Sequence, residues 1–249
     1  MAHYAVHTPI QAKEELASMY RSKPRYGQKS PKYAAMIQSV DQAVGKIISA
    51  LEDTGIADRT VIIFTSDNGG FSRFTNNSPL RAGKGYPYEG GIRVPLIIRC
   101  PAVVKPGTIS REPVTSVDYL PTICELAGVK PPADRAIDGL SLVDHLRANG
   151  TAKLPRDAIF WHFPHYRDEI APYSIVRSGR WKLIRRYEGD TFELFNLEED
   201  ISETNDLART MPEKVRQLNA RLTAWLNDAV AKLPKPNPDY RPKTDKDKK

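Results

Sequence analysis

The sequence is poor in cysteine and contains no long hydrophobic segment. With only 2 Cys among 249 residues, a framework of disulfides cannot organise the fold. No stretch reaches the roughly 18 consecutive apolar residues that a transmembrane helix requires, so no membrane span is expected. The first residues also lack a basic segment followed by an apolar one, so we expect no signal peptide in this chain.

Positive charge is in excess but is not concentrated. The formal net charge is +7, with 27% charged and 40% hydrophobic residues, which is typical of a folded, soluble chain. The last 17 residues hold six Lys or Arg and three Asp, and the rest of the excess is spread along the sequence. A nucleic-acid-binding domain usually gathers its basic residues on one face or one helix. We therefore expect no nucleic-acid partner.

The two ends of the chain carry different signals. Residues 234–249 are rich in Pro and Lys and predict a disordered tail, with an interaction arm as the alternative. Tyr4–Val6 looks like the end of a strand, and His7–Pro9 looks like the loop that follows it. A start in mid-strand leads us to expect a C-terminal portion of a longer protein, or a truncated reading frame of one.

Apolar periodicity predicts an α/β part at residues 1–153. Residues 31–54 place apolar side chains three and four positions apart, which predicts one amphipathic helix that stops at Gly55. Val61–Thr65 and Val94–Arg99 are short apolar runs, typical of strands in a parallel sheet covered on both faces. The other predicted helices are residues 116–127 and 141–148.

From residue 154 the pattern changes to short apolar runs separated by turn signals such as Ser178-Gly179, which predicts an antiparallel meander. An amphipathic helix follows, with Leu218, Leu222 and Leu226 on one face. We therefore expect a small sheet-plus-helix part at residues 154–233. Its predicted strands are residues 158–163, 173–176, 181–184 and 192–195.

The strongest local signal for chemistry follows the first predicted strand. In an open parallel sheet, ligands bind beyond the carboxyl ends of the strands, and Ser66–Gly70 occupies such a position. Asp67 and Asn68 offer two hard oxygen ligands for a metal ion, and the glycines allow a backbone or a ligand to approach closely. The alternative is a plain Asx-turn that closes a strand.

A glycine-rich loop with four charged residues follows at residues 79–95. A lysine flanked by glycines, as Lys84 is, often meets anionic oxygens as a point charge. Beside an Asp–Asn metal site, such a lysine suits a tetrahedral oxyanion ester. Taken alone, the loop could equally be a solvated surface turn. The other charged residues of the loop are Arg81, Glu89 and Arg93.

Several distinctive motifs follow one another along the chain: His7–Pro9, Ser66–Gly70, Leu80–Gly85, Tyr88–Pro95, Val117–Gly128, Asp138–Leu142, Glu193–Asp200 and Glu203–Leu207. In this order they resemble the C-terminal half of a type I sulfatase, in the alkaline-phosphatase-like superfamily. The resemblance runs from about Ala5 to about Leu233. It implies part of a mixed sheet flanked by helices, then a small antiparallel sheet plus a C-terminal helix, and an enzyme that hydrolyses sulfate esters.

The resemblance implies that two residues bind a metal ion and that two take part in catalysis. Asp67 and Asn68 would be calcium ligands. Lys84 would contact the sulfate and the leaving-group oxygen. His7 would hydrogen-bond the sulfate ester and help to protonate the departing alcohol, a task that suits an imidazole.

Further residues would support the site or line it. Arg81, Glu89 and Arg93 would fix the loop around the lysine. His162 and His165 lie where sulfatases often build part of the substrate rim, although packing within an aromatic strand is the alternative for both. Aromatic side chains near them could stack on a sugar or an aryl group, so a sulfated carbohydrate is one candidate substrate.

Part of the implied active site has no counterpart in the sequence. A type I sulfatase needs Cys, or sometimes Ser, in Cys-x-Pro-x-Arg, which is oxidised to formylglycine; neither Cys100 nor Cys124 lies in such a motif. Ser22–Tyr26 is a near miss with Tyr where Arg is required. The family's N-terminal acidic pair is also absent, and calcium takes about six to eight oxygens. We therefore expect a missing N-terminal half to supply both, and this chain alone to be inactive.

Three functions follow from these observations. The first is a sulfatase-family hydrolase in which this chain supplies the metal, sulfate and substrate contacts, with the missing N-terminal half as its partner. The second is a phosphate or phosphonate ester hydrolase on the same scaffold. The third is a non-catalytic remnant that binds sulfated glycans. The motifs around Lys84 favour the first, and the family implies a periplasmic or secreted location.

Overall fold

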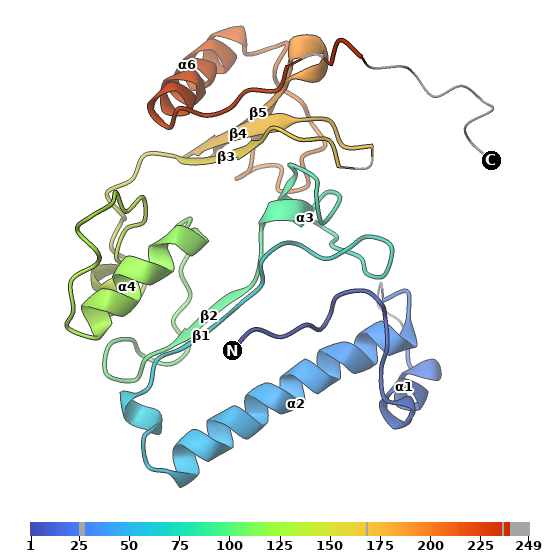
Figure 1. The fold of residues 1–249 in the computed structure, drawn as a ribbon, viewed down its shortest axis with the longest axis vertical. Helices are drawn as coiled ribbons and strands as arrows, with labels where there is room; N and C mark the ends of the chain where they lie inside the picture. The colour runs from blue at the N-terminus through green and yellow to red at the C-terminus, as the bar shows by residue number, and fades with distance from the viewer. Residues whose placement is uncertain (25–27, 168, 236, 240–249) are drawn as a thin grey trace. The chain divides into compact units, whose positions relative to one another are not determined.

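The computed structural model describes residues 1–24, 28–167, 169–235 and 237–239 (Figure 1). The chain divides into two compact units: Met1–Ile159 with Ile201–Thr204, and Phe160–Asp200 with Asn205–Lys249. Part of the near-miss motif at Ser22–Tyr26 and most of the predicted tail lie outside the described residues. None of the helices in the described ranges combines the length and the apolar character needed to cross a membrane.

Two helices open the first unit: α1 (Glu14–Arg21) and α2 (Pro31–Asp53). The proline lies in the first turn of α2, where its missing N–H costs nothing, and Gly55 follows the helix with a φ of +67°, which glycine adopts without steric cost. The predicted helix at 31–54 is therefore confirmed. Helix α1 was not predicted, because eight residues carry too short a periodic signal.

The N-terminal residues form a turn instead of the expected strand end. No helix or strand is present before α1, and the N–H of His7 donates to the carbonyl of Tyr4 at 3.0 Å. The hydroxyl of Tyr4 also donates to the carbonyl of Thr8. The prediction that Tyr4–Val6 ends a strand is wrong, because local hydrogen bonds occupy groups that a strand would offer to a neighbour.

Strands β1 (Ile62–Thr65) and β2 (Leu96–Arg99) form a two-stranded sheet. They pair antiparallel, with Ile63 opposite Ile98. The prediction of a parallel sheet covered on both faces is wrong for this pair, since an apolar run indicates a strand but does not encode the direction of its neighbour. Nor is the pair covered within the described residues: Phe64 is 36% and Ile97 is 62% exposed.

The remaining helices of the first unit are α3 (Glu89–Ile92), α4 (Tyr119–Leu126) and α5 (Val143–Arg147). A 3₁₀ turn at Ser116–Asp118 leads directly into α4, so the predicted helix at 116–127 is confirmed with a tighter first turn. The predicted helix at 141–148 is confirmed as α5. Near it, Leu142, Leu146 and Leu154 form a buried apolar cluster.

A buried ion pair organises the start of α4. The Asp118 side chain is 0% exposed and accepts hydrogen bonds from Thr115 N (2.9 Å), Leu140 N (2.9 Å) and both Nη atoms of Arg156 (2.7 and 2.9 Å). Burial raises the pKa of this carboxyl, but the hydrogen bonds and the Arg156 charge outweigh burial and hold the pKa below its ordinary value.

The second unit contains a four-stranded sheet and a covering helix. The sheet order is β3-β4-β5-β6, and both β4–β5 and β5–β6 pair antiparallel, so the predicted meander is confirmed. Helix α6 packs against β4 and β5 (Figure 1). Its residues Leu218, Leu222 and Leu226 are buried. The bounds are β3 Ile159–Phe163, β4 Tyr173–Ser178, β5 Trp181–Arg186, β6 Thr191–Asn196 and α6 Pro212–Asp228.

Replacing Asp118 with Asn is expected to lower the free energy of unfolding by about 3 kcal/mol, because the Arg156 guanidinium would stay buried without its counter-charge. The folded pKa of Asp118 lies below the unfolded value of about 3.9. Its contribution is therefore complete above about pH 5 and is lost as the pH falls through the folded pKa. Urea unfolding at pH 7 and at pH 3 measures both effects.

Asp134→Asn is the matched control for this substitution. Asp134 also accepts two hydrogen bonds from one arginine, Arg135, at 2.9 and 2.8 Å, but its side chain is 68% exposed. Solvent screens this pair, so little change in stability is expected. Equal losses in the two variants would contradict the assignment of the stabilisation to the buried pair.

Candidate active site

Two loops meet through their main chains beyond the carboxyl end of β1. We call residues 66–70 the Asp67 loop and residues 81–91 the Lys84 loop. The N–H of Gly69 donates to the carbonyl of Gly91 at 2.9 Å, and the N–H of Lys84 donates to the carbonyl of Gly70 at 3.1 Å. The structure therefore brings together the two segments that the sequence singled out separately.

Close packing at this junction requires glycine. A Cβ on Gly69 would lie 1.8 Å from the carbonyl oxygen of Gly90, and a Cβ on Gly91 would lie 2.1 Å from that of Tyr86. Both distances are far shorter than any allowed contact, and the obstacle in each case is backbone that cannot swing aside. The glycines thus serve the approach of one backbone to another, which is one of the two uses expected from the sequence.

Asn77 also ties the two loops together and was not predicted. Its Nδ2 donates to the carbonyls of Gly70 and Ala82, both at 2.9 Å. One amide side chain thus bridges the end of the Asp67 loop and the start of the Lys84 loop. The residue stands in a polar stretch without periodicity, so the sequence carries no signal for this role.

The two candidate metal ligands lie directly after β1. Asp67 is exposed and Asn68 is half-buried. The Nδ2 of Asn68 donates to the carbonyl of Gly69 at 3.1 Å, which leaves its Oδ1 as an acceptor. A carboxylate and an amide oxygen fit the preference of calcium for oxygen ligands, but they are two of about six to eight. In the described part of the chain, no three His, Cys, Asp or Glu side chains are grouped so as to hold a metal.

The charged groups of Asp67 and Lys84 are available to a ligand. Lys84 is half-buried, and its main chain is fixed by the bond to Gly70. Among the described residues, neither the Asp67 carboxylate nor the Lys84 ammonium makes a hydrogen bond or an ion pair. A carboxylate and an ammonium without protein partners can bind a cation and an anion, respectively.

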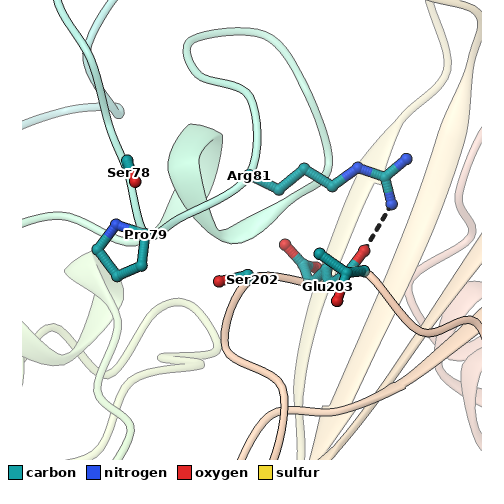
Figure 2. Close-up of a pocket in the computed structure, with 6 residues that line it drawn as sticks. Ser78, Pro79, Arg81, Ser202 and Glu203 are labelled. Atoms are coloured by element: carbon teal, nitrogen blue, oxygen red, sulfur yellow. Dashed lines mark hydrogen bonds between the residues drawn. The ribbon is translucent and has the colours of Figure 1, made fainter. Parts of the chain in front are cut away.

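The three residues expected to support the loop all make structural contacts. The guanidinium of Arg81 lies over the ring of Tyr88, 3.8 Å from its centroid, and its Nη1 donates to the carbonyl of Glu203 at 2.8 Å (Figure 2). The side chain of Glu89 is 2% exposed and lies 3.6 Å from Nη1 of Arg93. These contacts fit the predicted supporting roles, and the assignment of the three residues to the site stays a prediction.

Glu203 also contacts the Lys84 loop, and the sequence analysis gave this residue no role of its own. It is 0% exposed, and its Oε2 accepts a hydrogen bond from the N–H of Glu89 at 2.6 Å. The motif Glu203–Leu207 was noted only as part of the family resemblance. Glu203 and Arg81 line a cavity of about 540 Å³, and Figure 2 shows the residues around it. The cavity is lined by Ser78, Pro79, Arg81, Ser202, Glu203 and Thr204.

His7 and the predicted rim histidines make none of the hydrogen bonds that join the two loops. Within the described residues, the hydrogen bonds and the ring contact of His7 are all with Tyr4 and Thr8. In the second unit, the ring nitrogens of His162 lie 2.7 Å from Ser174 Oγ and 3.0 Å from the carbonyl of Lys232, which favours the packing alternative for His162.

His165 differs from His162 in its surroundings. It is exposed, and its ring packs edge-on against Phe163 at 5.6 Å. The contact with Phe163 fits the packing role, and the exposure of the imidazole fits a role in the substrate rim. The two cysteines, Cys100 and Cys124, are both free and buried, so neither presents a thiol to solvent.

Comparison with known proteins identifies the family. Residues 1–129 match the sulfatase family. The chain belongs to the sulfatase family. Residues 83–232 also match the family described as N-sulphoglucosamine sulphohydrolase, C-terminal, so the two matches together cover nearly all of this sulfatase chain.

Individual sulfatases share the sequence and the fold. A sulfatase of Formosa agariphila is 39% identical, over 90% of this chain and 45% of that protein. The crystal structure of Ps i-CgsB in complex with k-i-k-neocarrahexaose is 33% identical with a TM-score of 0.77, over 89% of this chain and 48% of that one. The structure of BT4656 in complex with its substrate D-glucosamine-2-N,6-O-disulfate is 30% identical with a TM-score of 0.66, over 79% and 40%. The chain thus spans less than half the length of these relatives.

Replacing Gly69 with Ala is expected to lower the free energy of unfolding by about 3 kcal/mol, because the added methyl group would force the two loops apart. Urea unfolding of the purified chain measures the change. The control is Gly45→Ala in the exposed interior of α2, where a Cβ meets nothing within 4 Å. That variant should gain about 1 kcal/mol from helix propensity. A Gly69→Ala variant as stable as the parent would contradict the packing described for the loops.

Proposed function

We propose that this chain supplies the metal, sulfate and substrate contacts of an enzyme that hydrolyses sulfate esters. The observation that carries the proposal is the main-chain pairing of the Asp67 loop with the Lys84 loop. This pairing joins the main chains of the two segments that carry Asp67, Asn68 and Lys84. A cation and a lysine side by side are suited to bind and stabilise a tetrahedral oxyanion. Membership of the sulfatase family supports sulfate over other oxyanions.

Each residue has a defined task in this proposal. Asp67 and Asn68 would hold calcium together with oxygens from other residues, and calcium when bound would polarise the sulfate oxygens. Lys84 would bind the sulfate and the leaving-group oxygen through its ammonium. His7 would donate a proton to the departing alcohol, whose oxygen gains negative charge as the ester bond breaks.

We place the nucleophile outside residues 1–249. Neither Cys100 nor Cys124 lies in a Cys-x-Pro-x-Arg motif, and both side chains are buried. The formylglycine on which sulfatases rely therefore has no candidate precursor among the cysteines. On this proposal the chain binds a sulfate ester without cleaving it, and the rest of the calcium site also comes from elsewhere.

A sulfated carbohydrate is the substrate class we favour. The related BT4656 is described with a disulfated glucosamine as its substrate, which supports this class for the present chain. In the second unit we retain His165 as the rim candidate and drop His162, because both ring nitrogens of His162 lie within hydrogen-bond distance of protein oxygens. An exposed imidazole can hydrogen-bond or stack on a sugar.

Lys84→Ala is expected to weaken binding of D-glucosamine-2-N,6-O-disulfate to the purified chain about tenfold, since a charge-assisted contact to the sulfate would be lost. Isothermal titration calorimetry with and without calcium measures the affinity. Asp67→Ala should abolish the part of the affinity that depends on calcium. Lys46→Ala, which removes an exposed lysine from α2, is the charge-matched control and should bind like the parent.

Parallel titrations separate the alternative functions. Equal or tighter binding of glucosamine 6-phosphate would favour a phosphate ester hydrolase on the same scaffold. Release of free sulfate by the chain alone would contradict our placement of the nucleophile outside it. Binding that is the same in the parent and in the Lys84→Ala variant would contradict the proposed sulfate contact.

A further inference from the structure

Glu203 is bonded to both ends of the loop that carries Lys84. Its carbonyl accepts a hydrogen bond from Nη1 of Arg81 at 2.8 Å, and its Oε2 accepts one from the N–H of Glu89 at 2.6 Å (Figure 2). Although Glu203 lies 114 residues after Glu89, the segment Ile201–Thr204 belongs to the same compact unit as the loop. One buried residue therefore holds both Arg81, at the start of the Lys84 loop, and Glu89, near its end.

Glu203 makes these hydrogen bonds although its backbone conformation and its burial both cost free energy. Its φ is +53°, in the left-handed region that disfavours residues with a Cβ. Its side chain is 0% exposed, and a carboxylate taken out of water must be compensated by strong hydrogen bonds. Backbone strain of this kind persists where the surrounding contacts require one geometry.

The loop closes on itself between these two points. The carbonyl of Arg81 accepts a hydrogen bond from the N–H of Gly90 at 2.9 Å, and the guanidinium of Arg81 stacks on Tyr88. At its centre, Lys84 is held to the Asp67 loop through its main chain only. A lysine side chain has a long flexible stem, so the location of its ammonium depends on where the backbone places its Cα.

We propose that Glu203 is a positioning residue, which sets the location of the Lys84 ammonium by fixing both ends of the Lys84 loop. The proposal rests on the proposed function, because it treats Lys84 as the group that meets the sulfate. Glu203 itself contacts no substrate and acts through Lys84. A charged group displaced by about 1 Å can lose much of its effect on a bound or reacting group.

A double-mutant cycle tests this dependence. Glu203→Ala removes the carboxylate that holds Glu89 but keeps both the Cβ and the main-chain carbonyl that Arg81 binds. We expect it to weaken binding of D-glucosamine-2-N,6-O-disulfate about tenfold in the parent chain and to have no further effect in the Lys84→Ala background. Glu203→Gln retains an acceptor oxygen and should restore most of the affinity. Additive losses in the double variant would overturn the proposal.

Hydrogen exchange provides a readout that does not depend on a ligand. In Glu203→Ala, amides 82–91 should exchange at least about tenfold faster while those of α2 stay unchanged, because the loop loses one anchor without global unfolding. Glu52→Ala, which removes an exposed glutamate from α2, should leave amides 82–91 at the parent rate. Unchanged exchange at 82–91, or a uniform increase along the whole chain, would overturn the positioning role.

The two readouts separate this proposal from the proposed function. If the parent chain does not bind the disulfated sugar, or if Lys84→Ala binds it equally well, the proposed function fails. Hydrogen exchange alone then tests whether Glu203 fixes the Lys84 loop. Should Glu203→Ala not fold, Glu203→Gln takes its place in the exchange measurement. It keeps the shape of the side chain and loses only its charge, so a smaller increase in exchange confined to 82–91 is then the supporting result.

Discussion

The candidate site depends on main-chain hydrogen bonds between two loops that only glycine allows to approach. The pairs Gly69–Gly91 and Lys84–Gly70 join the segment after β1 to the segment before β2. Because the neighbouring backbone would lie within 1.8 Å of a Cβ on Gly69, no side chain can replace this contact. The roles proposed for Asp67 and Lys84 depend on that approach, since it joins the main chains of the two segments that carry them.

Two buried carboxylates hold different parts of the same unit. Asp118 is saturated by two backbone N–H groups and the fork of Arg156, and it orders the turn into α4. Glu203 instead binds both ends of the Lys84 loop, and the ammonium of Lys84 makes no hydrogen bond or ion pair within the described residues. Structural charges are thus paired and buried, whereas the charges of Asp67 and Lys84 stay available to a ligand. This contrast separates supporting residues from candidate binding residues.

Membership of the sulfatase family gives these charges a chemical context. A sulfate ester needs a cation at its oxygens, a donor for the departing alcohol and a nucleophile at sulfur, and these groups can come from distant segments if the fold places them accurately. The described residues offer candidates for the first two of these three. The chain spans less than half the length of the relatives it matches, so the complete activity is a proposal.

Local patterns in the sequence determined the helix at 31–54, the antiparallel meander and the amphipathic α6, because periodicity reports which face of an element is buried. The same local patterns pointed to the segments around Asp67 and Lys84, and close backbone approach was one of two uses that they suggested for the glycines. Tertiary structure alone decided the antiparallel pairing of β1 with β2, since an apolar run does not specify the direction of its neighbour. It also decided which partners lie against the buried carboxylates, because Arg156 is 38 residues from Asp118 and Glu203 is 114 residues from Glu89. Contacts at such separations leave no spacing signal in the sequence and arise only when the chain is folded.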